Sequence, residues 1–321
     1  MITAVVLTKE GGDYLKNCLD GLQEQSVSVS QIIVVHSFPC TKREKITYRY
    51  TNGYHGYAHA VNAGVHNLDT DYVFVLNDDT VLHRDCVKHL YRQAGKRCIV
   101  QPQIRSLDFP ETIDNTGHCI FSDGFNIARG RGDSIDTFFE EQLLVFSGAA
   151  FFFHRSALEE IGLLDEDLFS FGEDLDWSLR AIRLGYEIRY VASAIIWHKR
   201  GASHSRGGIK KGFWVERNRV CAMIRSWPRE LILQSAWHTT HRLSVMGLGT
   251  ISKEQNTSTE NTHKTALGAV LGMIAATPYL KTAYDKRKID RLRWRISDDD
   301  FMAMIQKHLP PKRRIWNPQF F

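Results

Sequence analysis

Cysteine is scarce in this chain, and its six residues are scattered. No two of them form a CxxC pair, which excludes the ligand spacing of a structural zinc site. Their irregular spacing is also unlike the framework of a small protein stapled by disulfides. We therefore expect six reduced thiols, as in a cytosolic protein.

Long apolar runs are absent as well. No uninterrupted apolar stretch reaches the roughly 18 residues that a membrane-spanning helix needs. We expect no signal peptide, because a strand-like stretch over 3–8 follows the first residues directly. These absences predict a cytoplasmic protein, with peripheral binding to the inner face of the cell membrane left open.

Charge is modest overall but unevenly distributed. The net charge is +5, and 43% of the residues are hydrophobic, which is enough for a sizeable core. Basic residues gather late in the sequence, at 286–288, 291–295 and 312–314. Such a cluster fits an anionic membrane surface or a nucleic acid, and it fits a solvated helix face equally well.

Buried strands alternate with helices through the first part of the chain. Short apolar runs typical of strands occupy 3–8, 32–35, 73–76 and 98–102, and an alternating strand is expected at 46–50. Helical spacing of apolar residues separates them at 14–22, 56–64 and 84–95. This alternation predicts an α/β fold with an open, Rossmann-like, mostly parallel sheet flanked by helices.

The strand at 73–76 runs directly into Asn77, Asp78 and Asp79. Ligands of open α/β sheets gather at the carboxyl ends of the strands. Two carboxylates at that place suit a divalent cation, which prefers hard oxygen ligands and can bridge phosphates. For these three residues alone, a polar turn that caps the next helix is the simpler interpretation.

The later part of the chain is predicted to be mostly helical. Glu173 and Asp174 begin a helix, and Asp176 and Arg180 within it are spaced for an ion pair. Further helices are expected at 211–226, 229–246 and 263–276, after a loop-rich segment at 104–142. We expect a catalytic domain over 1–225 and a helical C-terminal region over 226–321. One side of the helix at 263–276 carries Leu267, Val270, Leu271 and Ile274.

Four motifs follow one another along the chain. They are Gly56-Tyr57-Ala58 with Asn62-Ala63-Gly64, then Leu76-Asn77-Asp78-Asp79, then Phe146-Ser147-Gly148-Ala149-Ala150, and then Gly172-Glu173-Asp174-Leu175-Asp176 followed by Arg180, Gly185-Tyr186 and His198. Their order and spacing resemble the family 2 inverting glycosyltransferases of the GT-A fold, over residues 1–225. Within that family, the chain most resembles the rhamnosyltransferase-like and galactofuranosyltransferase-like branch.

The resemblance implies a nucleotide-diphosphate sugar as donor and Mn²⁺ or Mg²⁺ as cofactor. It also implies a glycan or lipid-linked acceptor, used in the synthesis of cell-surface polysaccharide. Asp79 and His198 stand at the family's metal-binding positions. The positions implied for donor binding are Thr8, Lys9, Glu10, His36, Gly56, Asn62, Asn77 and Asp78, and those for acceptor binding are Gly148 and Trp177. A core position is the more common role for a tryptophan such as Trp177.

Asp174 matches the family's catalytic base. Such a base removes the proton of the acceptor hydroxyl as its oxygen attacks the anomeric carbon of the sugar. Glu173 is expected to raise the pKa of Asp174 by like-charge repulsion. An N-terminal helix cap is an alternative role for either carboxylate, and it is compatible with catalysis.

Some positions depart from the family pattern. His36 follows the second strand where members usually have an Asp that contacts the nucleotide, so the identity of the nucleotide is left open. Asn77 replaces the first Asp of the metal-binding motif and removes one charge. The Gln-x-x-Arg-Trp motif of processive members is missing, because Arg291-Leu292-Arg293-Trp294 lacks the Gln. This favours single transfers or short runs.

Other classes of protein compete with the transferase. A nucleotidyltransferase would also combine a nucleotide-binding sheet with metal-binding carboxylates, but its Gly-rich phosphate loop is reduced here to Gly11-Gly12. A non-catalytic sugar- or nucleotide-binding relative is favoured by Asn77 and His36. Nucleic-acid binding has only the late basic residues in its favour, and we do not expect it. A homo-oligomer is left open.

Overall fold

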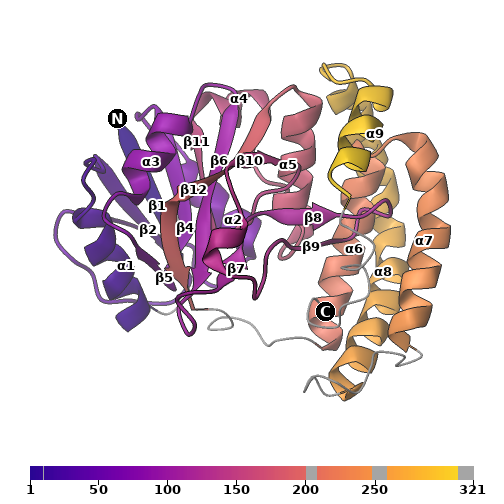
Figure 1. Ribbon diagram of the computed structural model, residues 1–321, viewed down its shortest axis with the longest axis horizontal. Coiled ribbons are helices and arrows are strands. Elements are labelled where there is room, and N and C mark those ends of the chain that lie inside the picture. The colour runs from indigo at the N-terminus through magenta and orange to yellow at the C-terminus, as the bar shows by residue number, and fades with distance from the viewer. Residues whose placement is uncertain (10, 200–207, 248–258, 310–321) are drawn as a thin grey trace. The chain divides into compact units, whose positions relative to one another are not determined.

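The computed structural model describes residues 1–9, 11–199, 208–247 and 259–309. The chain forms two compact units, and each combines segments that are separate in the sequence. The colours of Figure 1 follow the residue number along these segments. Unit 1 comprises Met1–His118, Ala128–Phe169 and Tyr186–Ser203. Unit 2 comprises Cys119–Ile127, Ser170–Gly185 and His204–Phe321.

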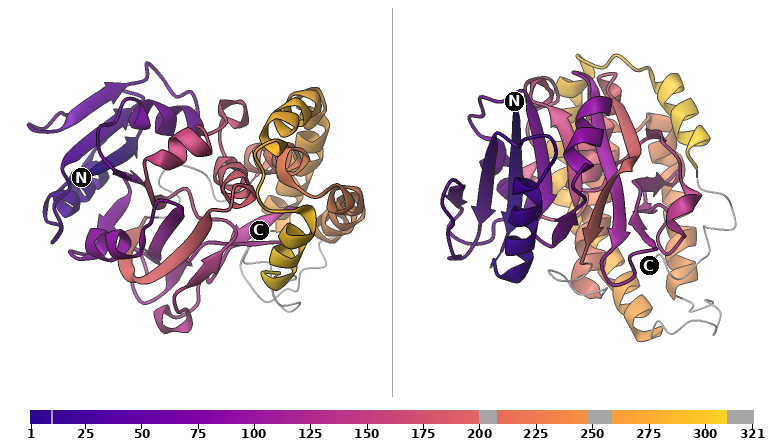
Figure 2. Two further views of the ribbon diagram at one scale, coloured as in Figure 1. Left: turned by 90° about the horizontal axis from the view of Figure 1, so that it is seen from above. Right: turned by 60° about the vertical axis from the view of Figure 1, so that its left-hand side comes forward.

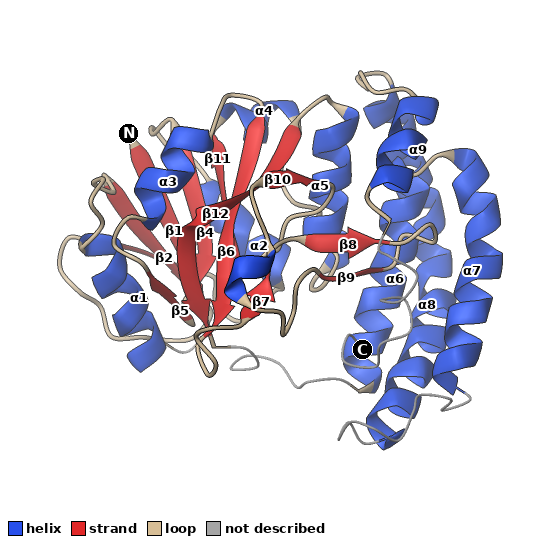
Figure 3. Cartoon of the chain, viewed as in Figure 1, coloured by secondary structure: helices blue, strands red, loops and turns tan. Residues whose placement is uncertain are grey.

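Unit 1 is built on a ten-stranded sheet (Figure 3). In spatial order its main strands are β10 (Glu141–Leu143), β12 (Glu187–His198), β6 (Cys98–Ser106), β11 (Ala150–His154), β4 (Tyr72–Asn77), β1 (Ile2–Thr8), β2 (Gln31–His36) and β3 (Thr47–Tyr50). Two short strands complete the sheet, since β5 (Thr80–Leu82) pairs with β12 and β7 (Ile113–Asn115) pairs with β6.

The direction of the strands brings the carboxyl ends of six strands to one edge of the sheet. Strands β1, β2, β3 and β4 pair in parallel, and β6 pairs in parallel with β12. Strand β11 is antiparallel to both β4 and β6, so β6 and β12 run in the same direction as β4. Thr8, His36, Asn77 and His198 therefore end their strands on the same edge, where ligands of open α/β sheets bind.

Helices cover both faces of this sheet. They are α1 (Asp13–Gln23), α2 (Tyr57–Val65), α3 (Cys86–Gln93) and α4 (Ser156–Glu160), with the 3₁₀ turns η1 (Ile135–Thr137) and η2 (Glu166–Leu168). Leu19 of α1 and Leu90 of α3 share one apolar cluster with Val6 of β1. On α2, an added Cβ at Gly64 would lie 2.2 Å from Val5 Cγ1. Because Val5 and Val6 point to opposite faces of β1, α2 lies on the face opposite to α1 and α3.

Unit 2 is mainly helical. Its helices are α5 (Glu173–Arg183), α6 (Ile209–Ser226), α7 (Arg229–Gly247), α8 (Thr259–Arg291) and α9 (Asp298–Lys307). A two-stranded sheet of β8 (His118–Ile120) and β9 (Asn126–Ala128) lies mostly in this unit as well. Helices α6, α7 and α8 lie side by side (Figure 2).

Glycines allow α6 and α8 to approach each other closely. An added Cβ would lie 2.1 Å from the carbonyl oxygen of Ile209 at Gly268, and 2.3 Å from that of Phe213 at Gly272. Gly212 on α6 meets the backbone of α8 in the same way. Any side chain at these positions would push the two helices apart, so these small residues fix the helix pair.

The helix predicted at 263–276 is in fact part of a longer one. Helix α8 continues through Pro278 to Arg291, beyond the end predicted at residue 276. A proline inside a helix costs about 3 kcal/mol, because it removes a hydrogen bond and crowds the preceding turn. Tertiary contacts hold α8 on both sides of it, through Gly272 before the proline and Arg287 after it. Arg287 donates to the carbonyl oxygen of Trp227 at 2.6 Å.

The sequence predicted no membrane-spanning helix, and α8, among the described residues, is the helix to compare with that prediction. Its part Lys264–Arg291 is long and apolar enough to cross a membrane by length and composition, and 33% of its most apolar window is buried. Core helices of soluble proteins pass the same test. Several apolar side chains of α8 remain exposed, among them Leu267 and Ile274.

The expected domain boundary at residue 225 does not coincide with the two units. Helix α5 and the segment Cys119–Ile127 group with the C-terminal helices. The side chain of Asn218 on α6 donates to the carbonyl oxygens of Ser170 (3.0 Å) and Phe171 (2.5 Å). These long-range bonds join the start of α5 to α6, which a division by sequence order cannot anticipate.

Candidate functional site

A side-chain hydrogen bond joins the ends of β1 and β4. Thr8 Oγ1 donates to Asp78 Oδ2 and accepts from the backbone N–H of Gly11 at 2.9 Å. Burial raises the pKa of Asp78, the bond from Thr8 lowers it, and the charge of Asp79 raises it again, to about 6. Such a carboxyl group readily loses its proton when a positive charge binds beside it.

Asp79 and His198 lie together on this edge, although they are far apart in the sequence. Their side chains are 3.3 Å apart, between Asp79 Oδ1 and His198 Nε2. The backbone fixes this approach, because His198 pairs with Thr80 and the N–H of Lys199 donates to the carbonyl oxygen of Asp79 at 2.9 Å. The two residues that the sequence assigned to one cation are therefore brought together.

A second carboxylate, Asp114 on β7, contacts the other nitrogen of the His198 ring. Asp114 Oδ2 lies 2.9 Å from His198 Nδ1. Burial alone would lower the pKa of His198, but its hydrogen bonds to Asp114 and Asp79, together with their charges, raise it to about 10. Sequence reasoning missed Asp114, because it lies in the loop-rich segment 104–142 and no spacing there marks it.

The side chains at this position fit a divalent cation. Asp79 is 4% exposed, and its Oδ1 atom is buried 3.3 Å from Nε2 of His198. A carboxylate oxygen and an imidazole nitrogen that share one small space are suitable ligands for such an ion. Within the described residues, no group of three or more His, Cys, Asp and Glu side chains could hold a metal ion. The remaining ligands would have to come from a bound molecule or from water.

His36 occupies the end of β2, next to Thr8 in the register of the sheet. Its ring stacks on Tyr50, with centroids 5.1 Å apart, and Nδ1 lies 3.0 Å from the carbonyl oxygen of Phe38. Because a carbonyl oxygen only accepts, Nδ1 carries the proton and Nε2 of the neutral ring is an acceptor. Nε2 is buried and has no partner among the described residues. His36 therefore presents an unused acceptor.

Asn77 and Gly148 are neighbours on the same edge. The backbone N–H of Asn77 donates to the carbonyl oxygen of Ala149 at 3.0 Å. The hydroxyl of Tyr57 donates to the carbonyl oxygen of Gly148. The segment that leads into β11 is thereby held beside the end of β4, which places Gly148 near Asn77.

Glu173 and Asp174 form the first turn of α5 but have different surroundings. Asp174 is partly exposed, and its Oδ1 accepts from the N–H of Leu175 at 2.8 Å. Glu173 is 6% exposed, and its Oε2 has no partner among the described residues. Burial, and then the charge of Asp174, raise the pKa of Glu173 well above its usual range. The like-charge effect of the neighbouring Asp174 thus adds to burial in favouring the protonated form of Glu173.

A protein-family model described as "Glycosyl transferase family group 2" matches residues 72–249, more than half of the chain. The chain belongs to this family. The match covers the strand end at Asn77–Asp79, the start of α5 and His198.

A solved structure of another protein is similar in fold to this glycosyl transferase. A crystal structure of GalNAc-T7 with UDP, GalNAc and Mn²⁺ matches with a TM-score of 0.56 at 12% sequence identity. The match covers 89% of this chain and 57% of that chain. Together with the family, it shows the GT-A fold predicted from the sequence. No curated protein matches the chain.

Two residues expected to bind the donor have structural roles. Asn62 is 7% exposed, and its amide donates to the carbonyl oxygen of Leu164 (2.9 Å) and to Glu166 Oε1 (2.8 Å). Its carbonyl oxygen accepts from the N–H of Leu164, so the whole amide is occupied in holding the loop before η2. Gly56 lies against the backbone of Phe169, where an added Cβ would be 2.2 Å from the carbonyl oxygen. We correct the donor-binding role of Asn62 and assign Gly56 first to this close approach.

The acceptor-binding role expected for Trp177 is also corrected. It is fully buried, with 0% of its surface exposed, so its ring is not available to stack on an acceptor sugar. The predicted pair of Asp176 and Arg180 forms at 2.8 Å, and Arg225 adds a second cation at 3.4 Å. Helix α5 is thus anchored through these buried groups.

Lys9 and Glu10 complete the predicted donor-binding positions. The Lys9 ammonium lies over the ring of Tyr54, 4.5 Å from its centroid. Glu10 lies outside the described residues. Lys9 is therefore near the end of β1, and its role toward a donor stays a prediction.

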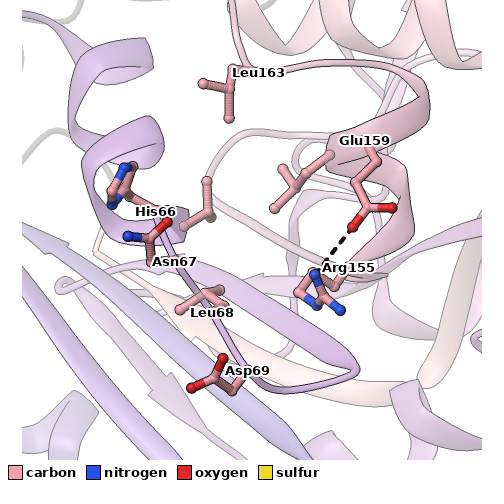
Figure 4. Close-up of a pocket in the computed structure, with 9 residues that line it drawn as sticks. His66, Asn67, Leu68, Asp69, Arg155, Glu159 and Leu163 are labelled. Atoms are coloured by element: carbon pink, nitrogen blue, oxygen red, sulfur yellow. Dashed lines mark hydrogen bonds and ion pairs between the residues drawn. The ribbon is translucent and has the colours of Figure 1, made fainter.

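A cavity of about 450 Å³ lies at the other edge of the sheet (Figure 4). It is lined by Val65, His66, Asn67, Leu68, Asp69, Arg155, Leu158, Glu159 and Leu163. Asp69 precedes β4 and Arg155 follows β11, so the cavity is at the amino end of β4. Arg155 is paired with Glu159 at 3.1 Å, and none of the predicted site residues lines the cavity.

Proposed function

We propose that this protein is an inverting, metal-dependent glycosyltransferase of the hexosyltransferase type. It moves a sugar from a nucleotide-diphosphate donor to a hydroxyl group of a glycan or lipid-linked acceptor. The observation that carries the proposal is the 3.3 Å approach of Asp79 to His198 beside Asp78, in a member of a glycosyl transferase family. The rhamnosyl- and galactofuranosyl-transferring branch, and a role in the synthesis of cell-surface polysaccharide, are part of the same proposal.

Asp79 and His198 would hold the divalent cation, which would neutralise charge on the diphosphate as it leaves the sugar. Mn²⁺ suits this ligand pair better than Mg²⁺, because imidazole is a poorer ligand for the harder ion. The structural neighbour was crystallised with UDP and Mn²⁺, which agrees with this choice. Asp78 and Asn77, on the adjoining turn, would contact the sugar or ribose.

His36 would contact the nucleobase. Its unused acceptor at Nε2 suits a base that presents an N–H group on its pairing edge, as uracil, thymine and guanine do. Cytosine and adenine present an acceptor at the same position instead. Thr8 and Lys9 would line the same donor subsite from β1.

Asp174 is the candidate base. Its carboxylate is partly exposed in the first turn of α5, and it stands at the base position of the family. The proton of the acceptor hydroxyl would pass to Asp174 as the oxygen attacks the anomeric carbon and the nucleoside diphosphate leaves. Glu173, whose protonated form is favoured by burial, would support the turn rather than take the proton. Gly148 stays a candidate for acceptor contact.

Peripheral membrane binding at the cytoplasmic face is a further part of the proposal. Leu267 (52% exposed) and Ile274 (65%) lie on one side of α8, and Lys281 and Lys288 follow at the same seven-residue spacing. An apolar stripe that continues into basic residues suits an anionic lipid surface, near a lipid-linked acceptor. Contact with a second copy of the chain is the competing use of this stripe.

The first experiment is a screen of nucleotide sugars on the full chain. UDP-, dTDP-, GDP- and CDP-sugars would be tested for a rise in melting temperature, with and without Mn²⁺, because ligands of the native state raise its stability. We expect a rise for one of the first three donors only when Mn²⁺ is present. A metal-independent rise with no later transfer would favour a non-catalytic binding protein. Incorporation of a nucleotide instead of a sugar into product would favour a nucleotidyltransferase.

A further inference from the structure

The ring of His198 has a carboxylate at each nitrogen. Asp79 Oδ1 lies 3.3 Å from Nε2, and Asp114 Oδ2 lies 2.9 Å from Nδ1. All three side chains are largely buried, with side-chain exposures of 14% for His198, 5% for Asp79 and 7% for Asp114. Only Asp79 and His198 have a place in the function proposed above. The role of Asp114 is therefore unassigned.

Asp114 is held firmly where it meets the ring. It lies in β7, which pairs with β6, and β6 pairs with β12 up to His198. The β6–β7 register shifts between Ile104 and Arg105, which is the kind of irregularity that re-aims a side chain. The second carboxylate oxygen of Asp114 is 3.5 Å from Arg131 Nε, which stabilises the negative charge.

The two nitrogens of His198 can be assigned from this arrangement. A carboxylate oxygen accepts, so Nδ1 carries the proton and donates to Asp114. Nε2 would release its proton when a cation binds, because a ligating imidazole is neutral, and its lone pair would then face the side where Asp79 lies. Histidines that bind metals commonly donate their other N–H to a carboxylate, which fixes the ring and raises its basicity.

We propose that Asp114 is a positioning residue that fixes the tautomer and orientation of His198, so that Nε2 and Asp79 Oδ1 together face one divalent cation. This inference rests on the metal site of the proposed function. Asp114 touches neither the cation nor the sugar; it acts only through the imidazole. Its effect is therefore on metal affinity rather than on donor recognition.

Mn²⁺ binding by the full chain, without donor or acceptor, tests this role independently of activity. Free Mn²⁺ would be measured by electron paramagnetic resonance for the wild type, Asp114→Ala, Asp114→Asn and His198→Ala. Asp114→Ala should weaken Mn²⁺ binding about 10- to 100-fold, the usual effect of losing such a partner. Asp114→Asn should recover part of this loss, because its amide oxygen can still accept from Nδ1. Asp136→Ala, an exposed carboxylate in η1 of the same segment, is the matched control and should bind as the wild type does.

A merely structural role gives a different pattern. In that case Asp114→Ala and Asp114→Asn lower the melting temperature without metal, while Mn²⁺ affinity stays at the wild-type value in the folded fraction, which overturns the inference. Wild-type affinity in Asp114→Ala with weak binding in His198→Ala overturns it too, and leaves the metal site of the proposed function in place. Wild-type Mn²⁺ affinity in His198→Ala would show that His198 does not bind the cation. That result overturns the metal site of the proposed function and, with it, the positioning role of Asp114.

Discussion

Gly56 packs directly against the carbonyl group of Phe169, and a Cβ at this glycine would be 2.2 Å from the carbonyl oxygen. The next residue, Tyr57, donates its N–H to the same oxygen at 2.7 Å. Phe169 itself has a φ of 60°, a conformation that side chains other than glycine rarely adopt. The start of α2 thus stabilises a strained residue just before the turn that begins α5.

Gly56→Ala should destabilise the protein more than a second glycine substitution with the same backbone requirement. Gly53→Ala is the control, since Gly53 also has a positive φ (107°) but its nearest atom would be 3.8 Å from an added Cβ. Both variants cost about 1–3 kcal/mol for placing a side chain on a backbone with positive φ. Gly56→Ala adds about 1–3 kcal/mol of overpacking. Urea unfolding measures both, and equal losses would show that the contact with Phe169 is unimportant.

Much of this arrangement was predictable from sequence. The apolar runs that end at Thr8, His36 and Asn77 predicted three strands, and parallel pairing then predicted one shared edge. Asp79 and His198 could be assigned to one site because each follows a strand end and matches a position of the family. The alternation of strands and helices predicted an open α/β sheet, and the resemblance of the four motifs to the family implied the GT-A fold.

Other features depend on contacts that leave no local pattern. Asp114 lies on a three-residue strand, and the residue that it contacts, His198, is 84 positions away in the sequence. The continuity of α8 through Pro278 comes from tertiary packing, which overrides a local helix breaker. Burial of Trp177 and the occupied amide of Asn62 could not be told from their residue types, because both residues are common in binding sites and in cores alike.

Asp174→Asn should abolish most sugar transfer while donor binding persists. The expected loss of turnover is about 10²–10⁴-fold, the usual contribution of a general base. Glu173→Gln should cost much less, because a neutral amide resembles the protonated carboxyl group that burial favours at this position. Initial rates and donor affinity for both variants decide the matter. Near-normal turnover in Asp174→Asn would place the base elsewhere.

The raised pKa of Glu173 also predicts a pH dependence of stability. Because its pKa is higher in the folded than in the unfolded state, the stabilising effect is full below about pH 4, where both states are protonated. It is lost as the pH rises through the folded-state pKa. The free energy of unfolding of Glu173→Gln should therefore fall less than that of the wild type as the pH rises above the unfolded-state pKa of a glutamate, about 4. Parallel curves for the two proteins would mean that Glu173 is charged at low cost.

The exposed stripe of α8 should bind anionic vesicles. Ile274→Glu should reduce flotation of the full chain with vesicles that contain phosphatidylserine, because it puts a negative charge into the apolar stripe. Gln306→Glu, at an exposed position of α9, adds the same charge outside the stripe and should have little effect. If neither the wild type nor the variants float, the stripe does not bind membranes, and a concentration-dependent mass would assign it to a second copy.

Metal-dependent release of nucleoside diphosphate tests the central claim most directly. The donor chosen by the thermal screen would be incubated with the full chain in Mn²⁺ or in excess EDTA, beside the Asp79→Ala variant. We expect release of nucleoside diphosphate by the wild type in Mn²⁺, little release in EDTA, and little release by Asp79→Ala under either condition. Equal release by Asp79→Ala and the wild type, or full release in EDTA, would contradict a cation held at Asp79 and His198.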